Sequence, residues 1–239
     1  MSKREVRVFA DASAVASAVA MCLEDAIETD VAMRGECHVV LTGGTVGIAL
    51  LRYVATSRII DWSDVHIWWG DERYVASESS DRNDGQAWDA LLSRIDIPNE
   101  NIHRITSPQT SESLEAAAQS YAADLAEFFG ADFPHFDVTL LGVGPDAHVA
   151  SLFPNLPGLA QMGKTVIAVR DSPKPPPERI SLSLPSINAS RRVWVVAAGA
   201  DKASAVATAL GSRTNGESPV SAVHGLEQTV FFLDEAARL

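Results

Sequence analysis

The chain alternates short runs of β-branched residues with longer alanine-rich segments, and this alternation is the feature that most restricts its fold. Such a rhythm is typical of βαβ units, because parallel strands need a long, usually helical, crossover between them. It predicts an α/β fold with a doubly wound, mainly parallel sheet and helices on both faces, in a Rossmann-like arrangement. We find no internal repeat and no linker-like segment, so we expect a single domain over residues 1–239.

The hydrophobic periodicity places the individual elements. The predicted strands are residues 6–9, 37–41, 65–69, 136–141, 165–169, 180–184, 192–197 and 230–233. The predicted helices are residues 12–29, the apolar stretch after residue 45 up to residue 53, and residues 81–95, 112–129 and 202–210. Asp11 is a suitable N-cap for the first helix, because its carboxylate can accept from free backbone N–H groups. The prolines within residues 173–177 predict a stiff, extended connection.

Composition excludes several classes of protein. With 46% apolar residues the chain can bury a full core, yet it has no apolar run long enough to span a membrane. The first residues lack a signal-peptide core, so we expect a cytoplasmic protein with no membrane partner. The net charge of −12 argues against a nucleic-acid partner. Cys22 and Cys37 form no Cys-x-x-Cys pair, so we predict neither a disulfide framework nor a zinc site.

Polar residues follow several predicted strands at the point where each strand ends. In open α/β sheets, ligands bind outside the carboxyl ends of the strands, so these residues are the first candidates for a site. The candidates are Thr42-Gly43-Gly44-Thr45 after residues 37–41, Asp71 to Arg73 after 65–69, Asp146 with His148 after 136–141, and Lys202 after 192–197.

The Thr42–Thr45 turn and Arg73 are candidates for holding an anion. A Gly-Gly turn between a strand and a helix lets backbone N–H groups approach a phosphate, and the helix N-terminus adds partial positive charge. The alternative is an ordinary tight turn, since paired glycines are common there. Arg73 could offer two N–H groups to phosphate, with Asp71 or Glu72 orienting it or a substrate hydroxyl. A surface ion pair is the alternative for Arg73.

The loop of residues 142–148 is a candidate for acid–base chemistry. Asp146 and His148 flank one small residue, and neighbouring glycines permit a turn close to a ligand. A neutral imidazole is a suitable general base for water, and a nearby carboxylate can fix its tautomer. A purely structural histidine is the alternative. The other histidines lie in strands or loops without evident partners, so we assign no role to His38, His66, His103, His135 and His224.

The segment Gly142–Ala147 formally matches the dinucleotide-binding fingerprint, with Asp171 at a tolerable distance downstream. We reject this interpretation because Pro154 and Pro157 would interrupt the crossover helix that the fingerprint requires. Asp146 would also place negative charge beside a pyrophosphate. The sequence contains no Gly-x-Ser-x-Gly elbow and no Walker loop, which removes the serine hydrolase and nucleoside triphosphatase alternatives.

Five segments taken together match a known family pattern over nearly the whole chain. They are residues 41–45, 70–73, 136–154, 174–180 and 199–202. This set resembles bacterial-type 6-phosphogluconolactonases, which share their fold with glucosamine-6-phosphate deaminases. The deaminases usually continue after the histidine into an Asn-Glu-Pro loop, whereas this chain has Ser151-Leu152-Phe153-Pro154. The triple proline that precedes Glu178-Arg179-Ile180 is also similar to the lactonases.

The resemblance implies an enzyme that hydrolyses 6-phospho-D-glucono-1,5-lactone to 6-phospho-D-gluconate in the oxidative pentose phosphate pathway, with no metal or organic cofactor. It implies that His148 activates a water molecule and that Asp146 orients and supports His148. The implied substrate-binding residues are Thr42, Gly43, Gly44, Thr45, Asp71, Arg73, Arg179 and Lys202. The implied partner is a small sugar phosphate lactone; the sequence does not give the oligomeric state, and a monomer is our working expectation.

Two departures from the family pattern keep alternatives open. The family usually reads Ser-Gly-Gly-Ser-Thr-Pro where residues 42–47 are Thr-Gly-Gly-Thr-Val-Gly, so the helix-starting proline is lost. Ala147 replaces the usual glycine between Asp146 and His148, and alanine does not easily adopt a positive φ. The alternatives are a glucosamine-6-phosphate deaminase and a non-catalytic sugar-phosphate-binding module.

Overall fold

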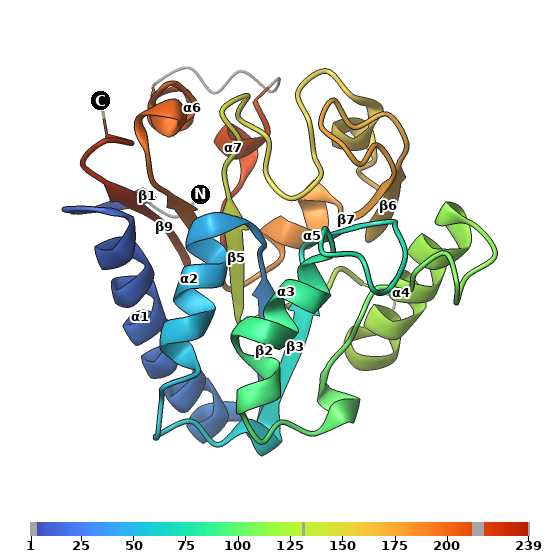
Figure 1. Cartoon of the computed structure of the whole chain (residues 1–239), viewed down its shortest axis with the longest axis horizontal. Helices are drawn as coiled ribbons and strands as arrows, with labels where there is room; N and C mark the ends of the chain where they lie inside the picture. Colours follow the sequence, from blue (N-terminus) through green and yellow to red (C-terminus); the bar gives the residue numbers. More distant parts are fainter. Residues whose placement is uncertain (1–3, 131, 212–217, 239) are drawn as a thin grey trace.

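The computed structural model describes residues 4–130, 132–211 and 218–238, and a six-stranded parallel sheet forms its centre (Figure 1). The strands lie in the order β1-β9-β8-β5-β2-β3. Their bounds are β1 (Arg4–Phe9), β2 (Cys37–Leu41), β3 (Val65–Trp69), β5 (Val138–Gly142), β8 (Arg192–Ala197) and β9 (Gln228–Asp234). The predicted mainly parallel α/β architecture is confirmed. Every residue of β2 is buried, as expected for a strand in the interior of a parallel sheet.

Helices surround this sheet. Their bounds are α1 (Ala12–Arg34), α2 (Gly44–Val54), α3 (Asn83–Ala90), α4 (Leu114–Phe129), α5 (Leu184–Asn188), α6 (Ala203–Leu210) and α7 (Pro219–Ala222). The first two lie side by side against the sheet (Figure 1). Asp11 caps α1 as predicted, since its carboxylate accepts from the Ala14 N–H at 2.9 Å. Among the described residues, no helix combines the length and apolar character needed to cross a membrane.

Helix α1 runs five residues beyond the predicted end at Thr29. Asp30 is fully buried in this last turn, where it pairs with Arg34 and Arg192 at 2.6 Å each. A charged residue is expected at an exposed position when a helix is predicted from hydrophobic periodicity. The last turn of α1 was therefore missed, because its buried position is filled by the charged Asp30. Gly35 then ends the helix in the left-handed conformation, with its N–H donated to the Val31 carbonyl.

The predicted helix over residues 81–95 is interrupted. Helix α3 ends at Ala90, because Leu91 has an extended φ of −134° that no helix accepts, and a short 3₁₀ turn over Leu92–Arg94 follows. The periodicity of the sequence continues across this break, since both pieces bury leucine or alanine against the same core. The prediction of one continuous helix is therefore wrong at residue 91.

A second, antiparallel sheet of three short strands lies beside the main one. It contains β4 (Asp71–Arg73), β7 (Arg179–Leu182) and β6 (Val166–Val169), with β7 in the middle. The predicted strand over residues 180–184 ends at Leu182 because Ser183 caps α5 instead. The pairing of β4 with β7 places Asp71 opposite Ser181 and Arg73 opposite Arg179, although more than a hundred residues separate them.

Three histidines that we expected to have no partners form a cluster at β2 and β3. Trp68 Nε1 donates to His38 Nδ1 at 3.1 Å, and His66 Nδ1 lies 3.0 Å from His103 Nε2. The His103 ring stacks on Trp68, and Phe128 of α4 covers the group edge-on. Burial lowers the pKa of His38 to about 4 and that of His103 to about 3, so both rings are neutral at neutral pH. The expectation of unpartnered rings is wrong, and the cluster is structural.

The Tyr121 hydroxyl of α4 fastens that helix to the end of β3. It accepts from the Trp69 backbone N–H at 2.9 Å and donates to the Trp69 carbonyl at 3.0 Å, and it is fully buried. We expect Tyr121→Phe to lower the free energy of unfolding by about 1–3 kcal/mol, because a buried N–H loses its partner. Urea titration of both proteins measures this change. The control Tyr53→Phe removes an exposed hydroxyl and should change stability by less than about 0.5 kcal/mol; equal effects of the two changes would contradict the prediction.

Candidate active site

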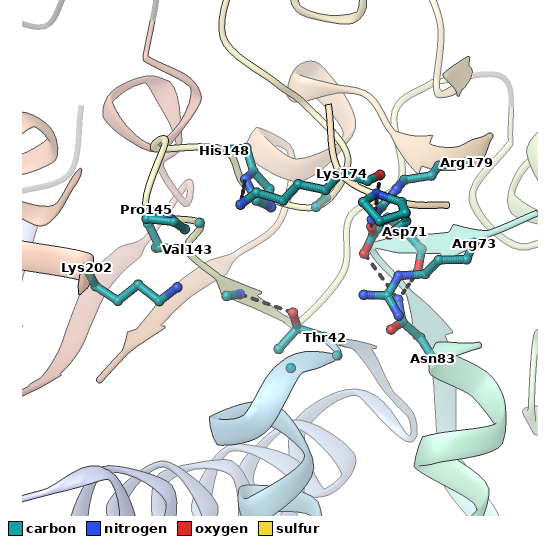
Figure 2. Close-up of a pocket in the computed structure, with 16 residues that line it drawn as sticks. Thr42, Asp71, Arg73, Asn83, Val143, Pro145, His148, Lys174, Arg179 and Lys202 are labelled. Carbon is teal, nitrogen blue, oxygen red and sulfur yellow. Dashed lines mark hydrogen bonds and ion pairs between the residues drawn. The ribbon is translucent and has the colours of Figure 1, made fainter. Parts of the chain in front are cut away.

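A cavity of about 290 Å³ opens where the carboxyl ends of β2, β5 and β8 meet the small sheet (Figure 2). Eight of the ten predicted site residues line it: Thr42, Gly43, Gly44, Asp71, Arg73, His148, Arg179 and Lys202. Thr42, Gly43, His148 and Lys202 follow strands of the large sheet, whose parallel pairing aligns their carboxyl ends at one edge. Asp71, Arg73 and Arg179 come from β4 and β7 of the small sheet. Asp146 lies next to His148, and Thr45 lines an adjoining cavity.

His148 and Asp146 form a hydrogen-bonded pair at the cavity wall. His148 Nδ1 lies 2.6 Å from Asp146 Oδ1, and the Phe153 ring packs 4.6 Å from the imidazole, centroid to centroid. When the carboxylate accepts the Nδ1 proton, Nε2 keeps a lone pair that can accept a proton. Burial lowers the pKa of His148 and outweighs the opposing effect of Asp146, so the imidazole is neutral at neutral pH. The pair is suited to general base catalysis.

Asp146 is ionised in this arrangement. Burial raises the pKa of its carboxyl, but the hydrogen bonds from His148 and Lys174 and the positive charge of Lys174 lower it by a larger amount, so the net shift is downward. A carboxylate that stays charged can hold the imidazole in one tautomer and stabilise an imidazolium when it forms. The position of Asp146 thus fits its predicted role, which is to orient His148.

Gly144 makes room for the His148 ring. A Cβ atom at Gly144 would lie 2.0 Å from His148 Nδ1 and 2.4 Å from Asp146 Oδ1, which is closer than any real contact. The Gly144 N–H also donates to the His148 carbonyl at 3.0 Å, which folds the loop back on itself. Glycine is thus required here by the close approach of a side chain.

Ala147 adopts the left-handed conformation, with φ of 68°. The departure from the family's usual glycine therefore leaves the turn in place, and the cost of an L-residue with positive φ, about 1–2 kcal/mol, is carried by the surrounding contacts. The Ala147 carbonyl accepts from the Val220 N–H of α7 at 3.1 Å, and its own N–H donates to Gly144. We expected alanine to avoid a positive φ here, but it adopts one, and these two hydrogen bonds help to hold it.

The Gly43-Gly44 turn begins α2, and a larger residue is disfavoured at either position. Gly44 has φ of 82°, which favours glycine, and a Cβ atom at Gly43 would lie 2.2 Å from Asn83 Oδ1. Gly43 caps the helix without a side-chain hydrogen bond, so the first N–H groups of α2 receive no side-chain acceptor from the cap. Thr42 Oγ1 accepts from the Gly142 N–H at 3.1 Å and joins this turn to the histidine loop.

The loss of the family's proline at position 47 has a local structural explanation. A Cβ atom at Gly47 would lie 2.7 Å from the Thr42 carbonyl oxygen, so the first turn of α2 closes more tightly than a larger residue would allow. The helix forms from Gly44 without a proline near its start. In this chain, without that proline, Gly43 and Gly44 of the turn line the cavity.

The charged residues after β3 divide between the cavity and the framework. Asp71 Oδ2 accepts from the Ser151 hydroxyl at 2.6 Å and lies 4.0 Å from Arg179 Nη1. Glu72 is almost fully buried, and its carboxylate accepts the N–H groups of Asn83 and Asp84 at the start of α3 at 2.7 and 2.8 Å. Glu72 therefore caps a helix, and the hypothesis that it orients a substrate hydroxyl is wrong.

The two predicted arginines have different surroundings. Arg73 donates Nη1 to the Asp81 carbonyl, while its buried Nε has no hydrogen-bond partner in the part of the chain that is described. Arg179 is buried and donates Nε to the Pro176 carbonyl at 3.1 Å and Nη2 to the carbonyls of Lys174 and Pro175 at 3.1 and 3.2 Å. Arg179 thus shapes the proline-rich loop, whereas Arg73 keeps hydrogen-bonding capacity at the cavity.

Two cavity residues were missed by the sequence analysis. Asn83 Nδ2 donates to the Asp71 carbonyl at 2.8 Å, so its Oδ1 faces Gly43; within the described residues this buried oxygen has no donor. Asn83 follows β3 by more than ten residues, and no local pattern marks it. Lys174 reaches His148 from the proline-rich loop (Figure 2). Its place in the motif of residues 174–180 was an available signal.

Within the described part of the chain, two groups of side chains have the composition of metal ligands. Glu36, His38 and His66 form one group, and Asp30, Cys37 and Asp137 form the other. In the first, His38 Nδ1 accepts from Trp68 Nε1, so a neutral ring carries its proton on Nε2, the nitrogen that faces Glu36 at 3.3 Å. In the second, both carboxylates are paired with arginines at 2.6–2.7 Å. His38 and both carboxylates of the second group are therefore already paired with neighbouring side chains of the protein.

Substitution at Gly144 should inactivate the site without unfolding the chain. We expect Gly144→Ala to reduce kcat by about 100-fold or more, because the added methyl displaces His148 from Asp146. Gly163→Ala is the matched control, since a Cβ atom at Gly163 meets nothing within 4 Å. Lactone hydrolysis assays and circular dichroism on both variants provide the measurement. Wild-type turnover in Gly144→Ala would show that the ring position is not needed.

Comparisons with known proteins identify the family of the chain. Residues 10–232 match the family model described as glucosamine-6-phosphate isomerases/6-phosphogluconolactonase. A 6-phosphogluconolactonase of Mycobacterium tuberculosis is 44% identical over 97% of this chain and 96% of its own, and one of Streptomyces coelicolor is 45% identical over 96% and 92%. The structure of 6-phosphogluconolactonase from Thermotoga maritima superposes with a TM-score of 0.86 at 26% identity, covering 98% of this chain and all of that one. A monomeric glucosamine-6-phosphate deaminase, at 18% identity and a TM-score of 0.81, shares the fold. The chain belongs to the glucosamine-6-phosphate isomerase/6-phosphogluconolactonase family.

Proposed function

We propose that this protein hydrolyses 6-phospho-D-glucono-1,5-lactone to 6-phospho-D-gluconate, in the oxidative pentose phosphate pathway. The observation that carries the proposal is the His148–Asp146 pair on the wall of a cavity that also holds Arg73 and Lys202. Relatives that are 44–45% identical over nearly the whole chain are named for this activity. A base beside cationic groups is what an anionic ester substrate requires.

In the proposed reaction, His148 takes a proton from a water molecule as the water oxygen attacks the lactone carbonyl carbon. The attack forms a tetrahedral intermediate, which collapses by breaking the bond between that carbon and the ring oxygen. The imidazolium of His148 returns its proton to the departing ring oxygen, which becomes the hydroxyl of the open-chain product. Asp146 stabilises the imidazolium while it exists. Acid–base catalysis of this kind is worth about 100- to 10,000-fold.

The phosphate of the substrate is placed in this proposal at the Gly43-Gly44 turn. The helix N-terminus supplies N–H groups and partial positive charge, and Lys202 supplies a full charge from the opposite wall. Arg73 can add hydrogen bonds, and Asp71 can accept from a sugar hydroxyl. These local groups are needed because the chain as a whole carries −12. Thr45, in the adjoining cavity, can contact the phosphate only from the far side of the turn.

The proposal includes a cellular compartment and a partner. We place the reaction in the cytoplasm, as the sequence predicts, with a small sugar phosphate lactone as the partner. A monomer stays the working expectation.

His148→Ala is the direct test. We expect kcat to fall by about 100- to 10,000-fold, because water loses its general base, and the fold to be unchanged. Freshly generated lactone at slightly acidic pH keeps spontaneous hydrolysis slow, and acid release is followed over time. His135→Ala, on an exposed histidine that does not line the cavity, should retain wild-type activity.

Equal rates for wild type and His148→Ala would contradict the catalytic role of His148. Glucosamine 6-phosphate is tested in parallel. Ammonia release from it, without lactone hydrolysis, would show that the protein is a deaminase. Binding of 6-phosphogluconate without any turnover would instead identify a non-catalytic module.

Lys202 tests the placement of the phosphate. Its Nζ lies 3.0 Å from Asp201 Oδ2 and points towards the cavity (Figure 2). We expect Lys202→Met to raise KM about tenfold or more while kcat changes little, because one charge-assisted contact to the phosphate is lost. Steady-state kinetics measure both constants, with Lys164→Met on an exposed turn as control. An unchanged KM would place the phosphate elsewhere in the cavity.

A further inference from the structure

Lys174 brings its ammonium group to the oxygen that joins Asp146 and His148. Its Nζ lies 3.1 Å from Asp146 Oδ1 and 3.5 Å from His148 Nδ1, and its extended side chain reaches towards His148 in Figure 2. The same carboxylate oxygen is 2.6 Å from His148 Nδ1. One carboxylate oxygen of Asp146 therefore contacts both the ammonium group and the imidazole. Lys174 has no role in the reaction steps proposed above.

The backbone that carries Lys174 is anchored. Its carbonyl accepts from the Ser172 hydroxyl at 2.8 Å and from Arg179 Nη2 at 3.1 Å, and its N–H donates to the Ser172 oxygen. Arg179 holds the next two carbonyls of the loop as well, and prolines fill positions 175–177. A side chain that is partly exposed is thus extended from a fixed point, which limits where its charge can lie.

The charged groups around His148 act in opposite directions. Burial is the largest influence and lowers the pKa of the imidazole; Asp146 and Asp71 raise it, and Lys174 lowers it. The Phe153 ring, which also packs against the imidazole, carries no charge. Removal of Lys174 would take away a positive charge that acts against the two carboxylates, both of which favour the imidazolium. An imidazolium cannot accept a proton from water, so the balance of these charges decides whether the base is available.

We propose that Lys174 is a positioning residue for the reaction, whose ammonium group fixes Asp146 and keeps His148 in its neutral, proton-accepting form. The inference rests on the proposed function for the identity of the base. Lys174 acts through Asp146 and the Nδ1 side of the ring, so its effect reaches the substrate through His148. This role differs from that of Lys202, which is proposed to contact the phosphate directly.

The pH dependence of kcat/KM separates these roles, because its acid limb reports the pKa of the free enzyme's essential base. Lys174→Met, Lys174→Arg and the exposed control Lys164→Met are compared with wild type between about pH 5 and about pH 7.5, with spontaneous hydrolysis subtracted. We expect the acid limb of Lys174→Met to move to higher pH, with a several-fold loss at the acid end and little loss at the other. Lys174→Arg keeps the charge and should restore the wild-type profile.

Two results of this experiment would overturn the proposal. A loss in Lys174→Met of the same size at every pH would mean that Lys174 contacts the substrate and leaves the titration of His148 alone. A profile identical to that of wild type would mean that the ammonium group has no influence on the base.

A second measurement needs no substrate. Histidine ring resonances of the free protein are titrated by NMR, and the resonance of His148 is the one that disappears in His148→Ala. We expect the His148 midpoint to be higher in Lys174→Met than in wild type, Lys174→Arg and Lys164→Met. An unchanged midpoint would overturn the inference even in an active enzyme. A raised midpoint in a protein that does not hydrolyse the lactone would refute the proposed function and leave the role of Lys174 standing.

Discussion

Parallel pairing of the strands is the constraint on which the rest of the molecule depends. Strand β5 lies between β2 and β8 and pairs with both in parallel. The carboxyl ends of the three strands therefore meet at one edge of the sheet. The loop after each strand must therefore share that edge with the others. The hydrogen bond between Thr42 and Gly142 is the point where two of these loops are joined. The small sheet adds Asp71 and Arg73 from the side, since β4 continues directly from β3.

Charge in this protein is divided between framework and site. The chain is strongly acidic, so an anionic substrate is attracted only where cations are locally concentrated. Several buried charges are committed to structure: Glu72 caps α3, and Arg179 clamps the proline-rich loop. Such groups make strong hydrogen bonds but leave little capacity for a ligand. The cations that line the cavity and are less buried than Arg179 are Arg73, Lys174 and Lys202, and the two lysines lie on either side of the histidine loop (Figure 2).

The histidine loop shows how local backbone cost is borne by distant contacts. Gly144 is needed because the His148 ring folds over its Cα, and a side chain there would collide with Nδ1. Ala147 takes a positive φ that alanine avoids in isolation, and the bond from Val220 helps to hold it there. Position 147 thus tolerates a residue that the family pattern disfavours, whereas position 144 does not. The difference is between a conformational cost of about 1–2 kcal/mol and a steric overlap.

The sequence by itself determined the elements and the chemistry of the main loops. Short runs of β-branched and apolar residues located the strands of the large sheet, Asp11 marked the start of α1, and the spacing of Asp146 and His148 indicated a base with its supporting carboxylate. These are local properties, set by residues within one helical turn or one loop. Tertiary structure alone decided the rest. It buried Asp30 beside Arg192, turned Glu72 towards α3, gave the histidines of β2 and β3 their partners, and brought Asn83 and Lys174 to the cavity. Each of these depends on which segment packs opposite, and a polar side chain has no sequence signal that tells whether its partner will be water, the framework or a ligand.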